Sequence, residues 1–202
     1  MDTLLVVVLV LLAVGAVIAV ALKLRRRSRP GPPPEPAAPV DPLASHEGVT
    51  DVRTLRAGDM VDYRGTLYFV RGSLRLTEGG YSWAEHFLDD ARSARCWISV
   101  EADPDVEVVL WTERDVPAEP GGEQMEVDGV TYRLDERGTA HYRSEGTTSL
   151  AEQGSVEYVD YTGDGGRALS FERFDGGKWE AGVGEAVVLS ALRVYPAGST
   201  RP

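Results

Sequence analysis

Aromatic rings next to carboxylates are the pattern in this sequence with the clearest chemistry. On a β-strand, residues two positions apart face the same side, so Trp83 with Glu85, and Tyr158 with Asp160, each present a ring and a carboxylate together. Rings and carboxylates suit a cation, such as an amine or a lysine or arginine side chain. We therefore predict that these four residues line a ligand- or partner-binding surface. The alternative is that the rings are core residues with solvated acidic neighbours. Similar neighbours occur at Trp97/Glu101, Trp111/Glu113 and Trp179/Glu180.

Metal binding and cofactor binding have little support. His46, His86 and His141 are isolated, and none has a second histidine or a cysteine at ligand spacing. The densest polar cluster is Glu85, His86, Asp89 and Asp90, and an extended strand would divide it between two faces. We predict no metal site and no cofactor.

Nucleophilic catalysis is not indicated either. The single cysteine, Cys96, falls in a strand-like run and is expected to be a buried apolar residue. There is no Gly-x-Ser-x-Gly motif, and the glycines at 163–166 precede a strand pattern instead of a helix. No spacing selects a catalytic pair from the 32 acidic residues. We predict that the protein is not an enzyme.

The N-terminal region predicts a membrane anchor. The uncharged run Leu4–Leu22 would span roughly 28 Å as a helix. We assign a transmembrane helix to 4–24, after a short extracytoplasmic tip at 1–3. The basic residues that follow the run favour the cytoplasmic side and can contact lipid headgroups: Lys23, Arg25, Arg26, Arg27 and Arg29.

This predicts a single-pass protein of the plasma membrane with its N-terminus outside and its C-terminal domain in the cytoplasm. The alternative is a cleaved signal peptide ending near Ala19-Val20-Ala21. The length of the run, the missing positive charge before it and the basic residues after it argue against cleavage.

Residues 25–50 read as a linker, first basic and then proline-rich, which favours an extended spacer. Beyond residue 30 the chain carries 31 acidic and 16 basic residues, a net charge of −15. That field disfavours nucleic acid and favours a cationic ligand or partner. Solubility alone is the other explanation of this charge.

From residue 51 the pattern is all-β and antiparallel. Asp128-Gly129 between apolar runs is a hairpin signal, and no helical period is sustained. Val61–Tyr68 and Met125–Tyr132 match at an offset of 64 residues, and Arg71-Gly72 matches Arg137-Gly138 at 66. We predict an internally duplicated β-meander, with a first repeat at 51–118 and a second at 119–202, packed as two sheets or as barrel-like halves. The remaining candidate strands are Tyr81–Asp89, Arg95–Glu101, Val106–Thr112, Ala140–Ser144, Ser155–Tyr161, Ala168–Phe174, Lys178–Ala181 and Val187–Tyr195.

Several of these segments resemble the bacterial domain of unknown function numbered 4178. The resemblance covers Leu55–Pro196 and is carried by Val61–Gly65, Trp83–His86, Trp97–Glu101 and Tyr158–Arg173. A histidine, His86, stands where the family's Trp-x-Glu-Tyr signature has an aromatic residue. The resemblance implies a β-rich domain without assigned activity. It also implies an actinobacterial, sometimes membrane-tethered type, often encoded beside small membrane proteins and a spermidine-synthase-like protein.

These observations predict a membrane-anchored, non-catalytic binding or adaptor module at the inner face of the membrane. Its partner would be a protein or, as the alternative, a small cation. A second hypothesis is an accessory or regulatory subunit of a membrane enzyme system, related to polyamines. An enzyme of unknown class is the third.

Overall fold

The structure is a computed structural model, and it describes residues 51–90, 95–102 and 104–197. The predicted tip at 1–3, transmembrane helix at 4–24 and linker at 25–50 lie outside these residues. Within the described ranges, no helical segment has the length and apolar character that a membrane crossing requires.

The described residues form eleven strands and two short 3-10 turns, so the predicted all-β, antiparallel class is confirmed. The 3-10 turns are η2 (Val52–Thr54) and η3 (Leu189–Ala191). The strands are β1 (Met60–Tyr63), β2 (Thr66–Glu78), β3 (Tyr81–Asp89), β4 (Cys96–Glu101), β5 (Glu107–Arg114), β6 (Gln124–Val127), β7 (Val130–Gly146), β8 (Gln153–Gly163), β9 (Arg167–Phe174), β10 (Glu180–Ala186) and β11 (Leu192–Tyr195).

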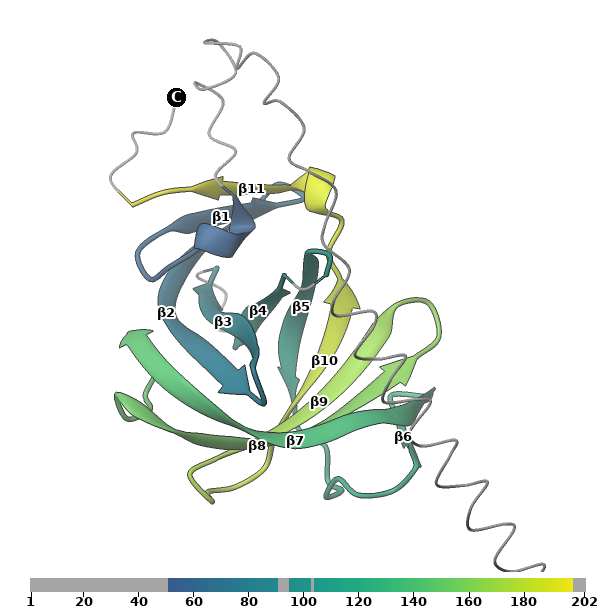
Figure 1. The fold of residues 1–202 in the computed structure, drawn as a ribbon. Coiled ribbons are helices and arrows are strands. Elements are labelled where there is room, and N and C mark those ends of the chain that lie inside the picture. The colour runs from purple at the N-terminus through teal and green to yellow at the C-terminus, as the bar shows by residue number, and fades with distance from the viewer. Residues whose placement is uncertain (1–50, 91–94, 103, 198–202) are drawn as a thin grey trace, which may run out of the picture. The chain divides into compact units, whose positions relative to one another are not determined.

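Eight of the strands close into one barrel. The sheet runs β11-β1-β2-β3-β4-β5-β10-β9-β8-β7-β6, and a further pairing of β2 with β7 closes the ring. In Figure 1 the blue strand β2 and the teal strands β3–β5 face the green strands β7–β9 across the interior. Because the ring is closed, each of these strands has one face toward the interior and one toward the outside.

The barrel is assembled from two consecutive meanders of the same order, β1–β5 and β6–β10. The β1–β2 turn and the β6–β7 turn both have two residues with positive φ, Arg64-Gly65 and Asp128-Gly129, as a type I′ hairpin requires. The long strand after each turn carries a β-bulge, between Val70 and Gly72 in β2 and between Leu134 and Glu136 in β7. The two halves therefore share one barrel, and they are joined by the β5–β10 and β2–β7 pairings.

Each half folds its first hairpin over its own outer wall. In the first half, Val61 of β1 packs against Ile98 and Val108 on the outside of β4 and β5, and Val194 of the C-terminal strand β11, which pairs with β1, joins this cluster. In the second half, Val127 of β6 contributes to a cluster with Tyr161 and Phe171 on the outside of β8 and β9. The bulges allow β2 and β7 to belong both to these hairpins and to the barrel wall, since a bulge bends a strand and adds twist.

The interior holds a third apolar cluster and a pair of stacked tryptophans. The cluster is centred on Leu76 of β2 and Tyr142 of β7. The rings of Trp97 and Trp111 stack with centroids 6.1 Å apart, next to β10. There Gly182 leaves room for the Trp97 ring, since a Cβ at that position would overlap the indole.

Two sequence expectations about the strands and the repeat are wrong, and a third is incomplete. Val187–Tyr195 is not one strand, because η3 interrupts it before β11. The strand expected at Ala140–Ser144 is only part of the 17-residue β7, whose start belongs to the hairpin. Arg71-Gly72 does not correspond to Arg137-Gly138, because the two bulges keep the 64-residue offset of the hairpins.

We expect Gly182→Ala to lower the free energy of unfolding by about 1–3 kcal/mol, because its methyl group would collide with the Trp97 ring. Urea unfolding checks this. The control is the double variant Gly182→Ala/Trp97→Phe, in which the smaller ring should make the alanine substitution less costly than it is beside Trp97. An equal cost in both backgrounds would contradict this packing.

Candidate functional site

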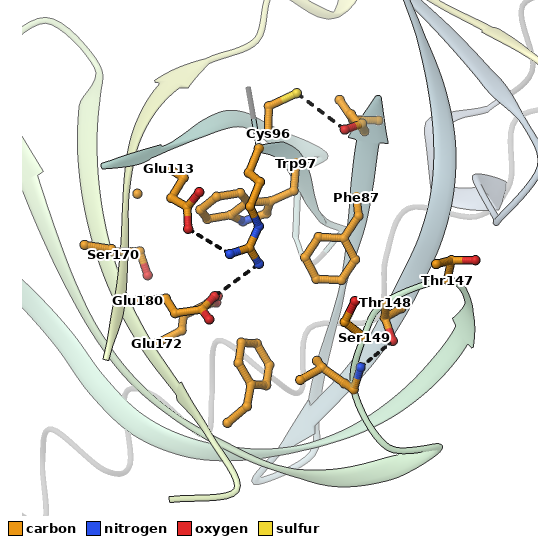
Figure 2. A pocket seen from close by; sticks show the side chains of 16 residues that line it. Phe87, Cys96, Trp97, Glu113, Thr147, Thr148, Ser149, Ser170, Glu172 and Glu180 are labelled. Atoms are coloured by element: carbon orange, nitrogen blue, oxygen red, sulfur yellow. Dashed lines mark hydrogen bonds and ion pairs between the residues drawn. The ribbon is translucent and has the colours of Figure 1, made fainter. Parts of the chain in front are cut away.

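The barrel interior contains a cavity of about 250 Å³, roughly the volume of eight waters in the liquid. Its walls come from β3, β4, β9 and β10 and from the segment between β7 and β8 at 147–150. Figure 2 shows Phe87 and Trp97 on one side of it and Glu172 with Ser170 on the other. We call this cavity the chamber.

Arg95 lies at the chamber wall between two carboxylates. Its guanidinium is 2.8 Å from Oε1 of Glu113 and 3.4 Å from Oε2 of Glu180, and these contacts are drawn as dashed lines in Figure 2. The three side chains are 59%, 39% and 51% exposed, so this cluster faces solvent. Since Glu113 is on β5 and Glu180 on β10, the cluster also connects the two halves of the barrel at the β5–β10 pairing.

Glu85 and Glu172 meet across the barrel, and of the two only Glu172 is among the residues that line the chamber. Their strands, β3 and β9, are not neighbours in the sheet, so the side chains approach through the interior. The two carboxyls share a hydrogen bond, and the indole N–H of Trp83 donates to Glu85. Burial raises the pKa of both carboxyls, and the negative charge of Glu85 raises that of Glu172 further. The pair therefore keeps a proton at pH values at which an ordinary glutamate is ionised.

Asp160 on β8 adds a third carboxyl to this group. Burial raises its pKa to about 7, although the Ser170 hydroxyl donates a hydrogen bond to it. The charges of Glu136 and Glu85 act in the same direction as burial. Two carboxylate oxygens, Oε2 of Glu85 and Oδ1 of Asp160, are buried without a hydrogen-bond partner among the described residues. Such oxygens are costly to bury.

The structure brings together the four residues singled out in the sequence. The rings of Trp83 and Tyr158 meet edge to face with centroids 5.8 Å apart, and Glu85 acts electrostatically on Asp160. All four face the barrel interior, and none of them is among the residues that line the chamber. The prediction that they line a binding surface stays a prediction. Tyr158 donates its hydroxyl hydrogen to Glu78, and burial raises the pKa of that hydroxyl.

Sequence reasoning missed Glu172 and Ser170. Both lie in the predicted strand at 168–174, and they alternate with the outward-facing Leu169, Phe171 and Arg173. That alternation was the available signal, because it places Ser170 and Glu172 on one face. It could not show that this face is internal, since that depends on the closure of the barrel.

Other predicted residues have structural roles. Cys96 is buried as expected, and burial raises its pKa to about 11. His86 is buried on the outer side of the wall, where its Nδ1 lies 2.8 Å from the Ser73 hydroxyl, and burial lowers its pKa to about 3. Trp179 packs outside the barrel, with the Arg173 guanidinium 4.7 Å from its ring centroid. The predicted lipid contacts from Lys23 to Arg29 lie outside the described residues.

A family model described as "Domain of unknown function (DUF4178)" matches residues 56–188. This chain belongs to the DUF4178 family. Relatives of this DUF4178 protein include "Uncharacterized protein Rv2597" of Mycobacterium tuberculosis and "Uncharacterized protein Mb2628" of Mycobacterium bovis. Each is 41% identical over 154 residues, which cover 72% of this chain and 73% of the relative. No solved structure matches. The predicted family is thus confirmed.

Protonation of Asp160 should make the stability of this DUF4178 domain depend on pH. Its folded pKa of about 7 lies above the unfolded value of about 3.9. The stabilising effect of the protonated form is complete below pH 4 and is lost as the pH rises toward 7. We expect Asp160→Asn, which cannot titrate, to gain stability relative to the wild type between pH 4 and pH 8 by a few kcal/mol.

Urea unfolding of the wild type and of Asp160→Asn at pH 4 and at pH 8 measures this gain. Asp164→Asn, at an exposed acid in the β8–β9 turn, is the matched control and should show no comparable gain. If the free energy of unfolding changed equally with pH in Asp160→Asn and in the wild type, that result would contradict the raised pKa of Asp160.

Proposed function

We propose that this DUF4178 protein is a non-catalytic binding module whose barrel interior receives a small molecule. The observation that carries this is the chamber, a space of about 250 Å³ in a closed barrel that is lined by Glu172, whose carboxyl is hydrogen-bonded to the buried Glu85. An eight-stranded barrel is just wide enough to be filled by its own side chains or to hold one small ligand. Pockets with aromatic walls and a few convergent polar groups are typical ligand sites.

The same proposal includes the membrane anchor at 4–24, with Lys23, Arg25, Arg26, Arg27 and Arg29 at the lipid surface and the barrel in the cytoplasm. The sequence supports it through the length of the apolar run and the basic residues that follow. A tethered receptor of this kind would pass its ligand state to a protein partner at the membrane. That partner could be an enzyme, with this chain as its regulatory subunit.

An enzyme is the second candidate, and the Glu85–Glu172 pair is the observation that favours it. Two interacting carboxyls with raised pKa values are suited to proton transfer near neutral pH. A turnover that Glu172→Gln abolishes while ligand binding persists would favour this candidate over the binding module.

A set of small fragments with cationic, anionic and neutral members tests the binding proposal. We expect saturation-transfer NMR on the full-length protein in nanodiscs to detect fragments of at least one class. Phe87→Trp should abolish these signals, because the larger ring would occupy the chamber that Phe87 lines.

Phe69→Trp is the matched control, since Phe69 is exposed (49%) and does not line the chamber. Its spectra should equal those of the wild type. Absence of binding in every class, or signals that survive Phe87→Trp, would contradict the proposal.

Membrane topology is tested separately by cysteine labelling. We expect Ser45→Cys in a Cys96→Ala background to resist an impermeant maleimide in intact cells and to react after lysis, because the proposed topology puts the linker in the cytoplasm. The Cys96→Ala protein alone is the control for background labelling. Reaction of Ser45→Cys in intact cells would place the domain outside.

A further inference from the structure

We propose that the ligand of the chamber is a small primary alkylammonium, whose charged head binds at Glu172, the chamber-lining member of a group that includes the buried Glu85 and Asp160 behind it. This rests on the proposed function, because it names the class of molecule that the chamber takes. Three observations support it: the charge of the chamber, the carboxylate oxygens without partners, and the shape of the walls.

The charge of the chamber favours a cation. Among the described residues that line it, Arg95 is the only cation, and Glu113 and Glu180 already pair with it. Glu172 is faced by Glu85 from β3, by Asp160 from β8 and by Glu180 from β10. Asp160 is faced in addition by Glu136 and Asp135 from β7. An anionic ligand would therefore be repelled from the part of the chamber that Glu172 lines, while a cation would relieve the repulsion among these carboxyls.

The oxygens without partners match the donors of an ammonium. Oε2 of Glu85 and Oδ1 of Asp160 are buried and accept no hydrogen bond among the described residues, and Glu85 is only 4% exposed. An ammonium group has three N–H donors and no acceptor, so it can donate to several carboxyls at once. Buried polar groups are normally satisfied. Neither Glu85 nor Asp160 is among the residues that line the chamber, so an ammonium at Glu172 would satisfy these oxygens only by entering between the carboxyls.

The site does not suit a metal ion, and its walls suit a hydrocarbon stem. Nowhere in the described ranges do three or more His, Cys, Asp or Glu side chains converge as metal ligands would. An organic cation needs less exact convergence, because its donors are spread around the head group. Phe87, Trp97 and Phe174 line the chamber beside Glu172, and aromatic faces attract both alkyl chains and ammonium groups.

Binding should exchange one proton. In the free protein, the Glu85–Glu172 pair holds one proton. When the ammonium binds at Glu172, the O–H bond of the pair breaks and its proton passes to the buffer. The resulting carboxylate then pairs with the ammonium, which keeps its own protons. Affinity should therefore rise with pH, over a range in which the ammonium itself stays charged.

The experiment uses full-length protein with ¹⁵N-labelled tryptophan in nanodiscs, titrated with n-butylamine, butan-1-ol and butyrate. The indole N–H signal of Trp97 reports on the chamber, while that of Trp179 outside the barrel is an internal reference. We expect n-butylamine to shift the Trp97 signal and to bind at least tenfold more tightly than butan-1-ol, with no shift from butyrate. Its Kd should decrease at least threefold from pH 6 to pH 8.

Glu172→Gln should weaken n-butylamine binding at least tenfold and remove its pH dependence. Asp160→Asn is the second variant and should also weaken binding. Glu157→Gln is the matched control, because Glu157 pairs with Arg173 on the outer face of the barrel, and it should bind as the wild type does.

Equal affinity for n-butylamine and butan-1-ol, or binding that Glu172→Gln leaves unchanged, would overturn the assignment of a cation. In that case, fragments of another class that still lose binding in Phe87→Trp would leave the chamber as a ligand site. If no fragment of any class binds, the proposed function itself fails.

Discussion

Closure of the barrel by two strand pairings, β5 with β10 and β2 with β7, is the constraint on which the rest of the structure depends. Without these pairings each half would be an open sheet with one uncovered face and unpaired edges, which is seldom stable alone. The packing of the interior shows the same dependence, because the Trp97 ring of the first half fits over Gly182 of the second. The side chain of Arg95, the residue just before β4, likewise bridges Glu113 of the first half and Glu180 of the second. The two meanders therefore have to fold as one unit.

The candidate site is a product of the same closure. Glu85 comes from the first half, while Glu172 and Asp160 come from the second, and they meet only because the ring places β3 opposite β8 and β9. Burying three carboxyls is costly, since the charged form loses its hydration, and the raised pKa values express that cost. A packed apolar interior would be more stable than this arrangement. Strongly perturbed carboxyls beside a cavity are a feature of functional sites, and that is why the chamber carries the proposed function.

The sequence predicted the local structure well and the long-range structure less well. Two-residue hairpins and alternating burial depend on neighbouring residues, so the strands and the turns at Arg64-Gly65 and Asp128-Gly129 could be recognised. The pairing of Trp83 with Glu85, and of Tyr158 with Asp160, followed from strand periodicity alone. Their location inside a barrel did not, because periodicity shows which residues share a face and not which face is internal. The length of β7 and the interruption by η3 also depend on partner strands that no local pattern reveals.

The protonation of Glu172 in the free protein tests the account most directly. Carboxyl-carbon NMR of protein labelled with ¹³C-glutamate, with the Glu172 signal assigned by its loss in Glu172→Gln, measures it. We expect Glu172, whose pKa burial and the charge of Glu85 raise well above the ordinary value, to show the chemical shift of a protonated carboxyl at pH 7 and to ionise only at higher pH. A Glu172 signal that is already that of a carboxylate at pH 7 would mean that the interior carboxyls are solvated. The chamber would then lack the electrostatic demand for a cation.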